Sequence, residues 1–365
     1  MTPRIHGGTD ALGPVRWDFS SNANACDPCP MALQAVLRAD AAHYPDPAYA
    51  RLRSALADLH GVDVARVLLA ASASEAIQRL TAWRWRAGDR RFWTPPHAYG
   101  DYAHAASAWG LERVDGPGQA QLAWLCDPGS PLGQGESHDA VRALLDPAPR
   151  TVVLDRAYAP LRLQGDSALS AGQLDRVWQL WSPNKALGLT GVRAAYAIAP
   201  LGAHRDVAAL DALSASWPIG AHGEAMLMAW ATSAVQDWVA ASRSTLADWA
   251  HALRHTLVAH GWTCAPSDTA YGCARPPQPL DAAALRERRI KLRDATSFGL
   301  PGWWRLSAQP PEALAALDAA LSEQTVLAED DVRDKGIRGT GFAGPLDTSP
   351  LRGEDAQRRR GAFES

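Results

Sequence analysis

Lysine is nearly absent from this 365-residue chain, because only three of its 36 basic residues are lysines: Lys185, Lys291 and Lys335. Chemistry that needs a primary amine therefore has very few candidates. Acidic and basic residues nearly balance, with a formal net charge of −3. A basic surface for nucleic acid is missing, so we expect no nucleic-acid partner.

Long apolar runs and paired cysteines are also scarce. No apolar stretch reaches the roughly 20 residues of a membrane-spanning helix, and residues 1–8 contain no apolar segment typical of a secretory signal. We therefore expect no membrane partner and a cytoplasmic location. Cys26 and Cys29 form a C-x-x-C pair, but no second such pair follows. We interpret both as reduced thiols in a turn and expect no metal site.

Short apolar strands alternate with helical segments along most of the chain, which predicts an α/β fold with a mainly parallel sheet. Apolar residues recur at helical spacing over 31–60, and two prolines within 44–47 interrupt this pattern. The same spacing over 221–260 predicts one or two long helices. The expected strands are 67–69, 91–93, 122–125, 151–154, 177–180 and 192–198.

Composition and pattern divide the chain into four segments. Residues 1–30 are expected to form an irregular N-terminal arm, and 31–220 a large α/β domain. Residues 221–327 hold the connecting helices and a small C-terminal α+β domain. The polar segment 328–365 is expected to be a disordered tail.

Lys185 lies in the segment 182–193, S-P-N-K-A-L-G-L-T-G-V-R, directly after an expected strand. An amine among small and apolar neighbours is a usable nucleophile. Arg193 and Ser182 lie close enough in a compact loop to hold an anion beside it. A Schiff-base lysine next to a phosphate site is typical of enzymes that use pyridoxal phosphate.

The same segment resembles the lysine loop of the fold-type I pyridoxal-phosphate enzymes, the class I/II aminotransferases. Their pattern is S-x-S-K-x-x-G-L-x-G-x-R, and Asn184 replaces its second serine. The resemblance spans about residues 5–322. It implies a three-layer large domain and a small α+β domain. It also implies pyridoxal phosphate as cofactor, Lys185 as the catalytic Schiff-base lysine, and Ser182 and Arg193 as cofactor ligands.

A second motif, D-R-A-Y at 155–158, resembles the family's D-E-A-Y. A carboxylate at the carboxyl end of a strand points into the crevice where α/β sheets bind ligands. The resemblance implies that Asp155 is a catalytic residue that pairs with the cofactor's ring nitrogen. Tyr158 would contact the ring hydroxyl. Arg156 departs from the family pattern.

The segment 70–75, A-A-S-A-S-E, resembles the family's glycine-rich loop that binds the cofactor phosphate at a helix N-terminus. The resemblance implies Ser72, Ala73 and Ser74 as the contacts. Glu75 follows Ser72 at the spacing of a capping box, which predicts that a helix begins here.

Two further motifs resemble parts of the family's cofactor site. Tyr99, in H-A-Y-G-D-Y, corresponds to the aromatic residue that stacks on the cofactor ring, whereas Tyr102 is expected to be a packing residue. The segment 127–133, D-P-G-S-P-L-G, resembles N-P-N-N-P-T-G. Ser130 there replaces the asparagine that bonds the ring hydroxyl, and its side chain is shorter.

The remaining implied site residues concern the substrate and a second subunit. Tyr44 resembles the tyrosine that contacts the cofactor phosphate of the neighbouring subunit in the histidinol-phosphate branch, which implies a homodimer with shared active sites. Arg305 resembles the arginine that binds the substrate carboxylate. Arg293 and Asn22 are implied as further substrate ligands.

The start of the chain distinguishes two branches of the family. His6-Gly7-Gly8, followed by D-F-S-S-N-A-N at 18–24, resembles the threonine-phosphate decarboxylases of cobalamin biosynthesis. Histidinol-phosphate aminotransferases share the N-x-N but usually lack the H-G-G. Three alternatives stay open for a small amino acid or amino phosphate substrate. They are decarboxylation, transamination, and cofactor binding with little turnover, the last suggested by Ser130 and the altered loop at 70–72.

Overall fold

The computed structural model describes residues 6–136, 138–146 and 150–334. The chain up to Ser322 forms one compact unit, and a second unit begins at Glu323. All predicted site residues and all the β-sheets described below lie in the first unit.

A seven-stranded sheet lies at the centre of the larger part of this unit, in the order β2-β8-β7-β6-β5-β3-β4. All neighbouring strands are parallel except the pairs formed by β8, which runs antiparallel to β2 and β7. As a result β2, β3, β5, β6 and β7 all end at one edge of the sheet. The strands are β2 (Val67–Ala70), β3 (Arg91–Trp93), β4 (Glu112–Arg113), β5 (Leu122–Cys126), β6 (Thr151–Asp155), β7 (Trp178–Trp181) and β8 (Ala195–Ile198). The predicted α/β fold with a mainly parallel sheet is confirmed.

Helices cover both faces of this sheet. They are α1 (Pro30–Leu37), α2 (Ala50–His60), α3 (Ala73–Arg86), α4 (Gly100–Ala108), α5 (His138–Leu145), α6 (Ala171–Leu174), α7 (His204–Asp211), α8 (Ala221–Trp230) and α9 (Ser233–Ala259). Alternate residues of a strand point to opposite faces. Leu68 and Trp124 pack in the core with α3, α4 and α7. Leu69 packs with α1, α2 and α8, and Leu125 with α5, on the other face. The result is three layers.

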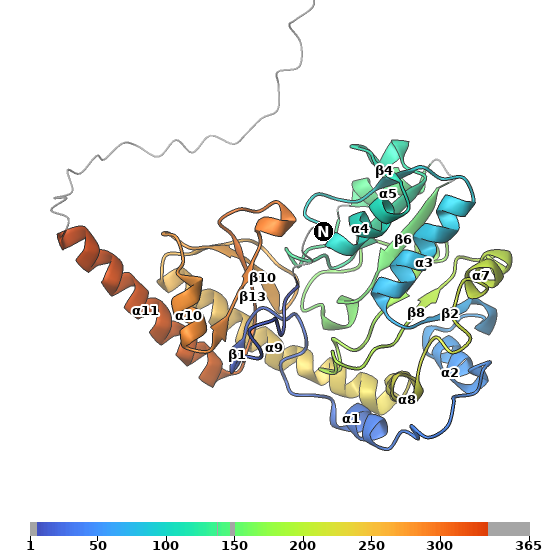
Figure 1. The fold of residues 1–365 in the computed structure, drawn as a ribbon, viewed down its shortest axis with the longest axis horizontal. Coiled ribbons are helices and arrows are strands. Elements are labelled where there is room, and N and C mark those ends of the chain that lie inside the picture. The colour runs from blue at the N-terminus through green and yellow to red at the C-terminus, as the bar shows by residue number, and fades with distance from the viewer. Residues whose placement is uncertain (1–5, 137, 147–149, 335–365) are drawn as a thin grey trace, which may run out of the picture. The chain divides into compact units, whose positions relative to one another are not determined.

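The smaller part of the unit has its own antiparallel sheet, in the order β12-β13-β10-β9. Its elements are β9 (Thr263–Cys264), β10 (Tyr271–Arg275), α10 (Ala282–Glu287), β11 (Ile290–Lys291), β12 (Arg293–Asp294), β13 (Trp304–Ser307) and the first part of α11 (Pro311–Asp334), a helix that continues past the end of the unit at Ser322. Helix α9 extends from the large sheet to this part (Figure 1). The N-terminal arm joins it too, because β1 (Trp17–Asp18) pairs with β11 and Phe19 is buried in its core.

Several sequence predictions can be compared directly with these elements. The predicted break between 31 and 60 separates α1 from α2. All five cysteines are free thiols, including Cys26 and Cys29. The predicted tail boundary at 328 falls inside α11, which continues to Asp334, and 335–365 lie outside the described residues. The division into segments 1–30, 31–220 and 221–327 stays a prediction.

Candidate active site

Most of the predicted cofactor residues lie at one edge of the large sheet, where its parallel strands end. Asp155 is the last residue of β6, and Ser130 follows β5 by four residues. Lys185 follows β7, and Ala73 begins α3 directly after β2. Ligands of open α/β sheets bind outside the carboxyl ends of the strands. The topology therefore brings these four positions to one crevice.

Asp155 is a buried carboxylate with two hydrogen-bond donors. It is 3% exposed, its Oδ1 accepts from the Ala157 N–H at 2.9 Å, and its Oδ2 accepts from the Tyr102 hydroxyl at 2.8 Å. Burial raises the pKa of Asp155, whereas the charge of Lys185 and the two hydrogen bonds lower it. The Lys185 charge and the hydrogen bonds only partly offset the effect of burial on this pKa, so a further cation would stabilise the ionised carboxylate.

Lys185 lies close to the predicted cofactor ligands. Its Nζ is 3.5 Å from Ser182 Oγ and 5.4 Å from the centre of the Tyr158 ring. The amine thus lies near both a hydroxyl and an aromatic ring. Its charge also acts on Asp155.

The lysine loop is held by the N-terminal arm, a feature that the sequence did not indicate. Asn24 N–H donates to the Lys185 carbonyl at 2.9 Å, and Cys29 N–H donates to the Leu187 carbonyl at 2.9 Å. The Asn24 side-chain amide donates to the Ala186 carbonyl at 3.1 Å. The segment with the C-x-x-C pair therefore supports the loop that carries the amine.

The N-terminus of α3 offers a site for an anion. Ser72 caps the helix and accepts from the Glu75 N–H at 3.1 Å, as the capping pattern predicted. The N–H groups of the first turn, which includes Ala73 and Ser74, have no acceptor within the helix. They and the helix dipole favour a phosphate at this position.

Asp101, in the first turn of α4, joins two predicted cofactor residues. Its Oδ2 accepts from Ser74 Oγ at 2.6 Å and from the Tyr99 hydroxyl at 2.8 Å. Burial and the Asp101 charge raise the pKa of Tyr99, so its hydroxyl stays protonated as a donor. Nothing in the sequence pointed to Asp101, because a carboxylate in the first turn of a helix is ordinary.

The expectation for Tyr102 needs a correction. Its ring does pack, since it is fully buried and stacks on Trp124 with centroids 5.0 Å apart. Its hydroxyl, however, bonds Asp155, so Tyr102 belongs to the site as well as to the core. Helical spacing predicted the burial of the ring but could not reveal the partner of the hydroxyl.

Hydrogen bonds join a further group of predicted site residues, which consists of Ser130, Asn22, Tyr158 and Arg305. The Asn22 amide lies 3.4 Å from both Ser130 Oγ and the Tyr158 hydroxyl, and Arg305 donates to Ser130 Oγ at 2.9 Å. Asn22 Oδ1 and Arg305 Nε are buried and have no hydrogen-bond partner among the described residues. Buried polar atoms are normally paired, so these two fit a bound polar molecule.

Two buried arginines create a positive field here. Arg293 on β12 pairs across the sheet with Arg305 on β13, and the two side chains are 3% and 6% exposed. Burial and the charge of Arg305 both lower the pKa of Arg293. Such a pair favours an anionic ligand.

The His6-Gly7-Gly8 segment lies against these residues. A Cβ on Gly7 would come within 1.9 Å of the Ser20 carbonyl and 2.8 Å of an Arg305 guanidinium nitrogen. Only glycine fits there without a shift of the backbone. The His6 ring lies 6.0 Å from that of Tyr99. The segment therefore extends from the predicted stacking residue to the predicted substrate arginine.

Two predicted ligands have exposed side chains. Arg193 lies two residues before β8, at the same sheet edge as Asp155, and its guanidinium contacts the Thr190 carbonyl at 3.5 Å. Tyr44 is 78% exposed, and its ring stacks on Trp217 at 4.4 Å rather than on another predicted site residue.

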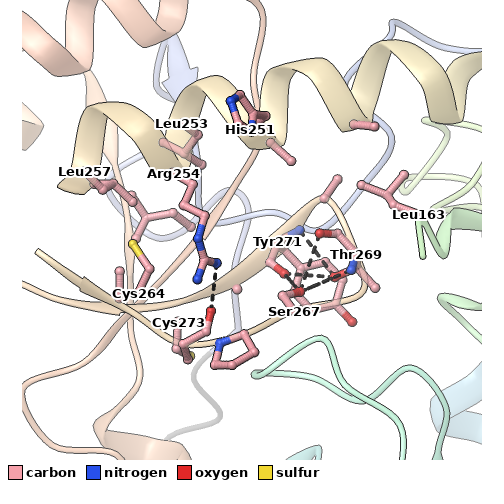
Figure 2. Close-up of a pocket in the computed structure, with 18 of the residues that line it drawn as sticks. Leu163, His251, Leu253, Arg254, Leu257, Cys264, Ser267, Thr269, Tyr271 and Cys273 are labelled. Carbon is pink, nitrogen blue, oxygen red and sulfur yellow. Dashed lines mark hydrogen bonds between the residues drawn. The ribbon is translucent and has the colours of Figure 1, made fainter. Parts of the chain in front are cut away.

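A separate cavity of about 460 Å³ lies between α9 and β9–β10 (Figure 2). None of the predicted site residues lines it. Its Ser267 and Thr269 hydroxyls already bond the Tyr271 carbonyl. In the described ranges, no group of three or more His, Cys, Asp or Glu residues could hold a metal ion, and no helix is long and apolar enough to cross a membrane.

Comparison with known proteins decides the family. Residues 16–321 match the sequence profile of aminotransferase class I and II. The chain belongs to this family. Membership confirms the predicted enzyme class and its cofactor, pyridoxal phosphate. The chemistry of the described site fits that cofactor, since it contains an amine, a buried carboxylate and a helix N-terminus.

Histidinol-phosphate aminotransferases and a threonine-phosphate decarboxylase are among the proteins that are similar to this chain. Histidinol-phosphate aminotransferase 2 of Rhizobium meliloti is 28% identical over 316 residues, which cover 80% of this chain and 87% of that protein. A histidinol-phosphate aminotransferase structure from Sinorhizobium meliloti, in complex with pyridoxal-5'-phosphate, has a TM-score of 0.69 at 21% identity and covers 83% of this chain and 89% of that one. L-threonine-O-3-phosphate decarboxylase from Porphyromonas gingivalis also has a TM-score of 0.69, at 22% identity over 85% of this chain and 99% of that one. At these identities the structural likeness establishes the fold.

Proposed function

We propose that this enzyme acts on a phosphorylated amino acid and that its reaction is the decarboxylation of threonine phosphate. The observation that carries the proposal is the position of His6-Gly7-Gly8. This motif, typical of the decarboxylase branch, packs against Arg305 at a point where only glycine fits. The L-threonine-O-3-phosphate decarboxylase from Porphyromonas gingivalis is also among the solved structures with the same fold.

The chain's own residues would hold the cofactor by charge and shape. Lys185 binds it through Nζ, Asp155 pairs with its ring nitrogen, and Tyr158 contacts its ring hydroxyl with Asn22 beside it. When bound, the cofactor withdraws electrons from the α-carbon of the substrate. The other proposed ligands are Ser72, Ala73, Ser74, Tyr99, Ser130, Ser182 and Arg193.

The two buried arginines would bind the two anionic groups of the substrate. Arg305 binds the carboxylate, and Arg293 binds the phosphate. Asn22 and Arg305 each have a buried atom without a partner among the described residues, which supports a polar ligand between them. In the decarboxylation, Lys185 would chiefly release the product.

Transamination of histidinol phosphate is the second candidate. The names of the sequence relatives favour it, including that of Rhizobium meliloti. In this reaction Lys185 would move a proton to and from the α-carbon as a general acid and base. Both reactions use the same residues and differ in the substrate bond that breaks.

We also propose a homodimer in which Tyr44 contacts the cofactor phosphate in the site of the other subunit. Tyr44 supports this because it is exposed and stacked on Trp217. A tyrosine presented in this way is available to a second copy of the chain.

An absorbance scan of the purified protein with pyridoxal phosphate, followed by threonine phosphate, tests the proposal. A visible cofactor band and released carbon dioxide, with no keto product, are expected. Loss of the band with an amino donor and its return with 2-oxoglutarate would instead identify an aminotransferase. Absence of any band would contradict both reactions and favour a site weakened by Ser130 and the loop at 70–72.

A further inference from the structure

The hydroxyl of Tyr102 is fixed in one place by its surroundings. The ring stacks on Trp124 of β5 at an interplanar angle of 7° and meets Tyr99 edge-on, with centroids 5.6 Å apart. The side chain is fully buried in the core between α4 and the sheet. The hydroxyl therefore cannot leave Asp155 without moving the core.

Tyr102 is the donor in this hydrogen bond. Burial and the nearby Asp155 charge raise the pKa of Tyr102 well above its ordinary value, so the hydroxyl keeps its proton. An ionised carboxylate can only accept. The other donor to Asp155 is the backbone N–H of Ala157, which only a substitution by proline would remove.

We infer that Tyr102 is a positioning residue that keeps Asp155 ionised and oriented for the cofactor's ring nitrogen. The inference rests on the proposed role of Asp155. Hydrogen bonds to the charged form of a buried carboxylate favour that form, and bonds to an ionised group are stronger than those between neutral groups. One fixed donor on each oxygen leaves the carboxylate a single orientation.

Other ionisable groups face Asp155 from several elements. Lys185 lies on the loop after β7, Asp101 and Tyr102 lie on α4, and Cys126 lies on β5. Of these groups, Tyr102 is the one that hydrogen-bonds a side-chain oxygen of Asp155. Substitution of its hydroxyl changes that bond while the charges of the other groups remain.

The test is a double-mutant cycle on cofactor binding with Tyr102→Phe and Asp155→Asn. Tyr102→Phe keeps the stacked ring and should weaken the affinity for pyridoxal phosphate about tenfold, since it removes one bond to a charged group. In the Asp155→Asn background the same change should have little further effect. In the otherwise wild-type enzyme, Tyr102→Phe should also lower kcat more than it raises the KM of the amino substrate.

Tyr196→Phe is the matched control. Tyr196 is equally buried, and its hydroxyl bonds His60 and Trp230 in the core on the opposite face of the sheet. Its loss should lower stability and leave cofactor affinity unchanged. On acidification, cofactor affinity should fall at a higher pH in Tyr102→Phe than in Tyr196→Phe or the wild type, because loss of the hydroxyl raises the pKa of Asp155.

Two results would overturn the inference, and they are distinguishable. An equal loss of affinity from Tyr102→Phe in the wild type and in Asp155→Asn would show that Tyr102 acts independently of Asp155. Unchanged affinity in Asp155→Asn alone would remove Asp155 from cofactor binding, and the proposed role and this inference would fail together.

Discussion

At the scale of single residues, Lys185 differs from the other described lysine in its surroundings. Lys291 forms an ion pair with Asp10 at 2.6 Å. Lys185 instead lies beside Ser182 and the Tyr158 ring, and its charge acts on a buried carboxylate. An amine that is not held in an ion pair is available to attack a carbonyl group, which is the property a nucleophile needs.

Lys185→Ala should therefore lower activity by at least about 10³-fold, because the other described lysine, Lys291, is held by Asp10 and the Gly8 carbonyl. The visible absorption of lysine-bound cofactor should disappear, while far-UV circular dichroism stays unchanged. Lys185→Arg is the control that keeps the positive charge near Asp155, and it should be equally inactive. Retained lysine-bound absorption in either variant would refute the assignment of Lys185.

At the scale of elements, the side chain of Asn24 connects the N-terminal arm with the lysine loop. Asn24 is 5% exposed, and its amide donates to the Ala186 carbonyl at 3.1 Å and to Ser242 Oγ at 2.8 Å. Its Oδ1 accepts from the Cys26 N–H at 3.0 Å. A single asparagine thus joins the arm, the lysine loop and α9.

Asn24→Ala should lower the free energy of unfolding by about 2–3 kcal/mol, because it leaves the Ala186 carbonyl and the Cys26 N–H without partners. Urea unfolding followed by tryptophan fluorescence measures this change. Cofactor affinity should fall as well, since the loop that carries Lys185 loses one of the three hydrogen bonds that join it to the arm. Ser21→Ala, which removes only a long contact of 3.4 Å, is the control. Equal stabilities of the two variants would contradict this role.

The end of α2 carries a histidine whose ionisation opposes folding. His60 bonds the Tyr196 hydroxyl at 2.8 Å, and its ring lies 4.7 Å from that of Trp181. Burial, with a smaller effect of the Arg156 charge, lowers the pKa of His60 to about 4. The unfolded chain binds this proton near pH 6.5 and the folded chain only near pH 4, so stability falls as the pH drops through this interval.

Between pH 6.5 and 4, the free energy of unfolding of His60→Gln should therefore fall by about 3 kcal/mol less than that of the wild type. Glutamine keeps a polar group near Tyr196 but does not titrate. The measurement is urea unfolding at a series of pH values. His255→Gln, at an exposed position on α9, should leave the dependence as it is in the wild type. An unchanged slope in His60→Gln would show that other groups cause the acid sensitivity.

Local patterns predicted the elements but not the contacts between distant segments. The strand ends and the motif spacing were sufficient to expect Lys185 and Asp155 at one edge of the sheet. The pairing of β1 with β11 was missed, because two residues carry no periodic signal. The bonds from Tyr102 to Asp155 and from Asn24 to Ala186 were missed for another reason, since they join residues 53 and 162 positions apart in the sequence.

At the scale of the whole molecule, the predicted homodimer implies that each active site contains residues of both chains. If Tyr44 acts in the site of the other subunit, Lys185 and the Tyr44 that serves it come from different chains. The exposed stack of Tyr44 on Trp217 is compatible with this arrangement. A dimer in which the two chains carry different substitutions can therefore separate shared sites from independent ones.

A hybrid of one Lys185→Ala chain and one Tyr44→Ala chain is the decisive molecule. With shared sites, both substitutions fall in the same site, and the other site is intact with wild-type cofactor affinity. With independent sites, one site lacks the lysine and the other lacks the tyrosine, so no site has wild-type affinity. We expect half of the wild-type activity at low cofactor concentration, measured on hybrids purified by two different affinity tags. Activity no higher than half that of the Tyr44→Ala homodimer would contradict shared sites, and a monomer in light scattering would contradict the dimer itself.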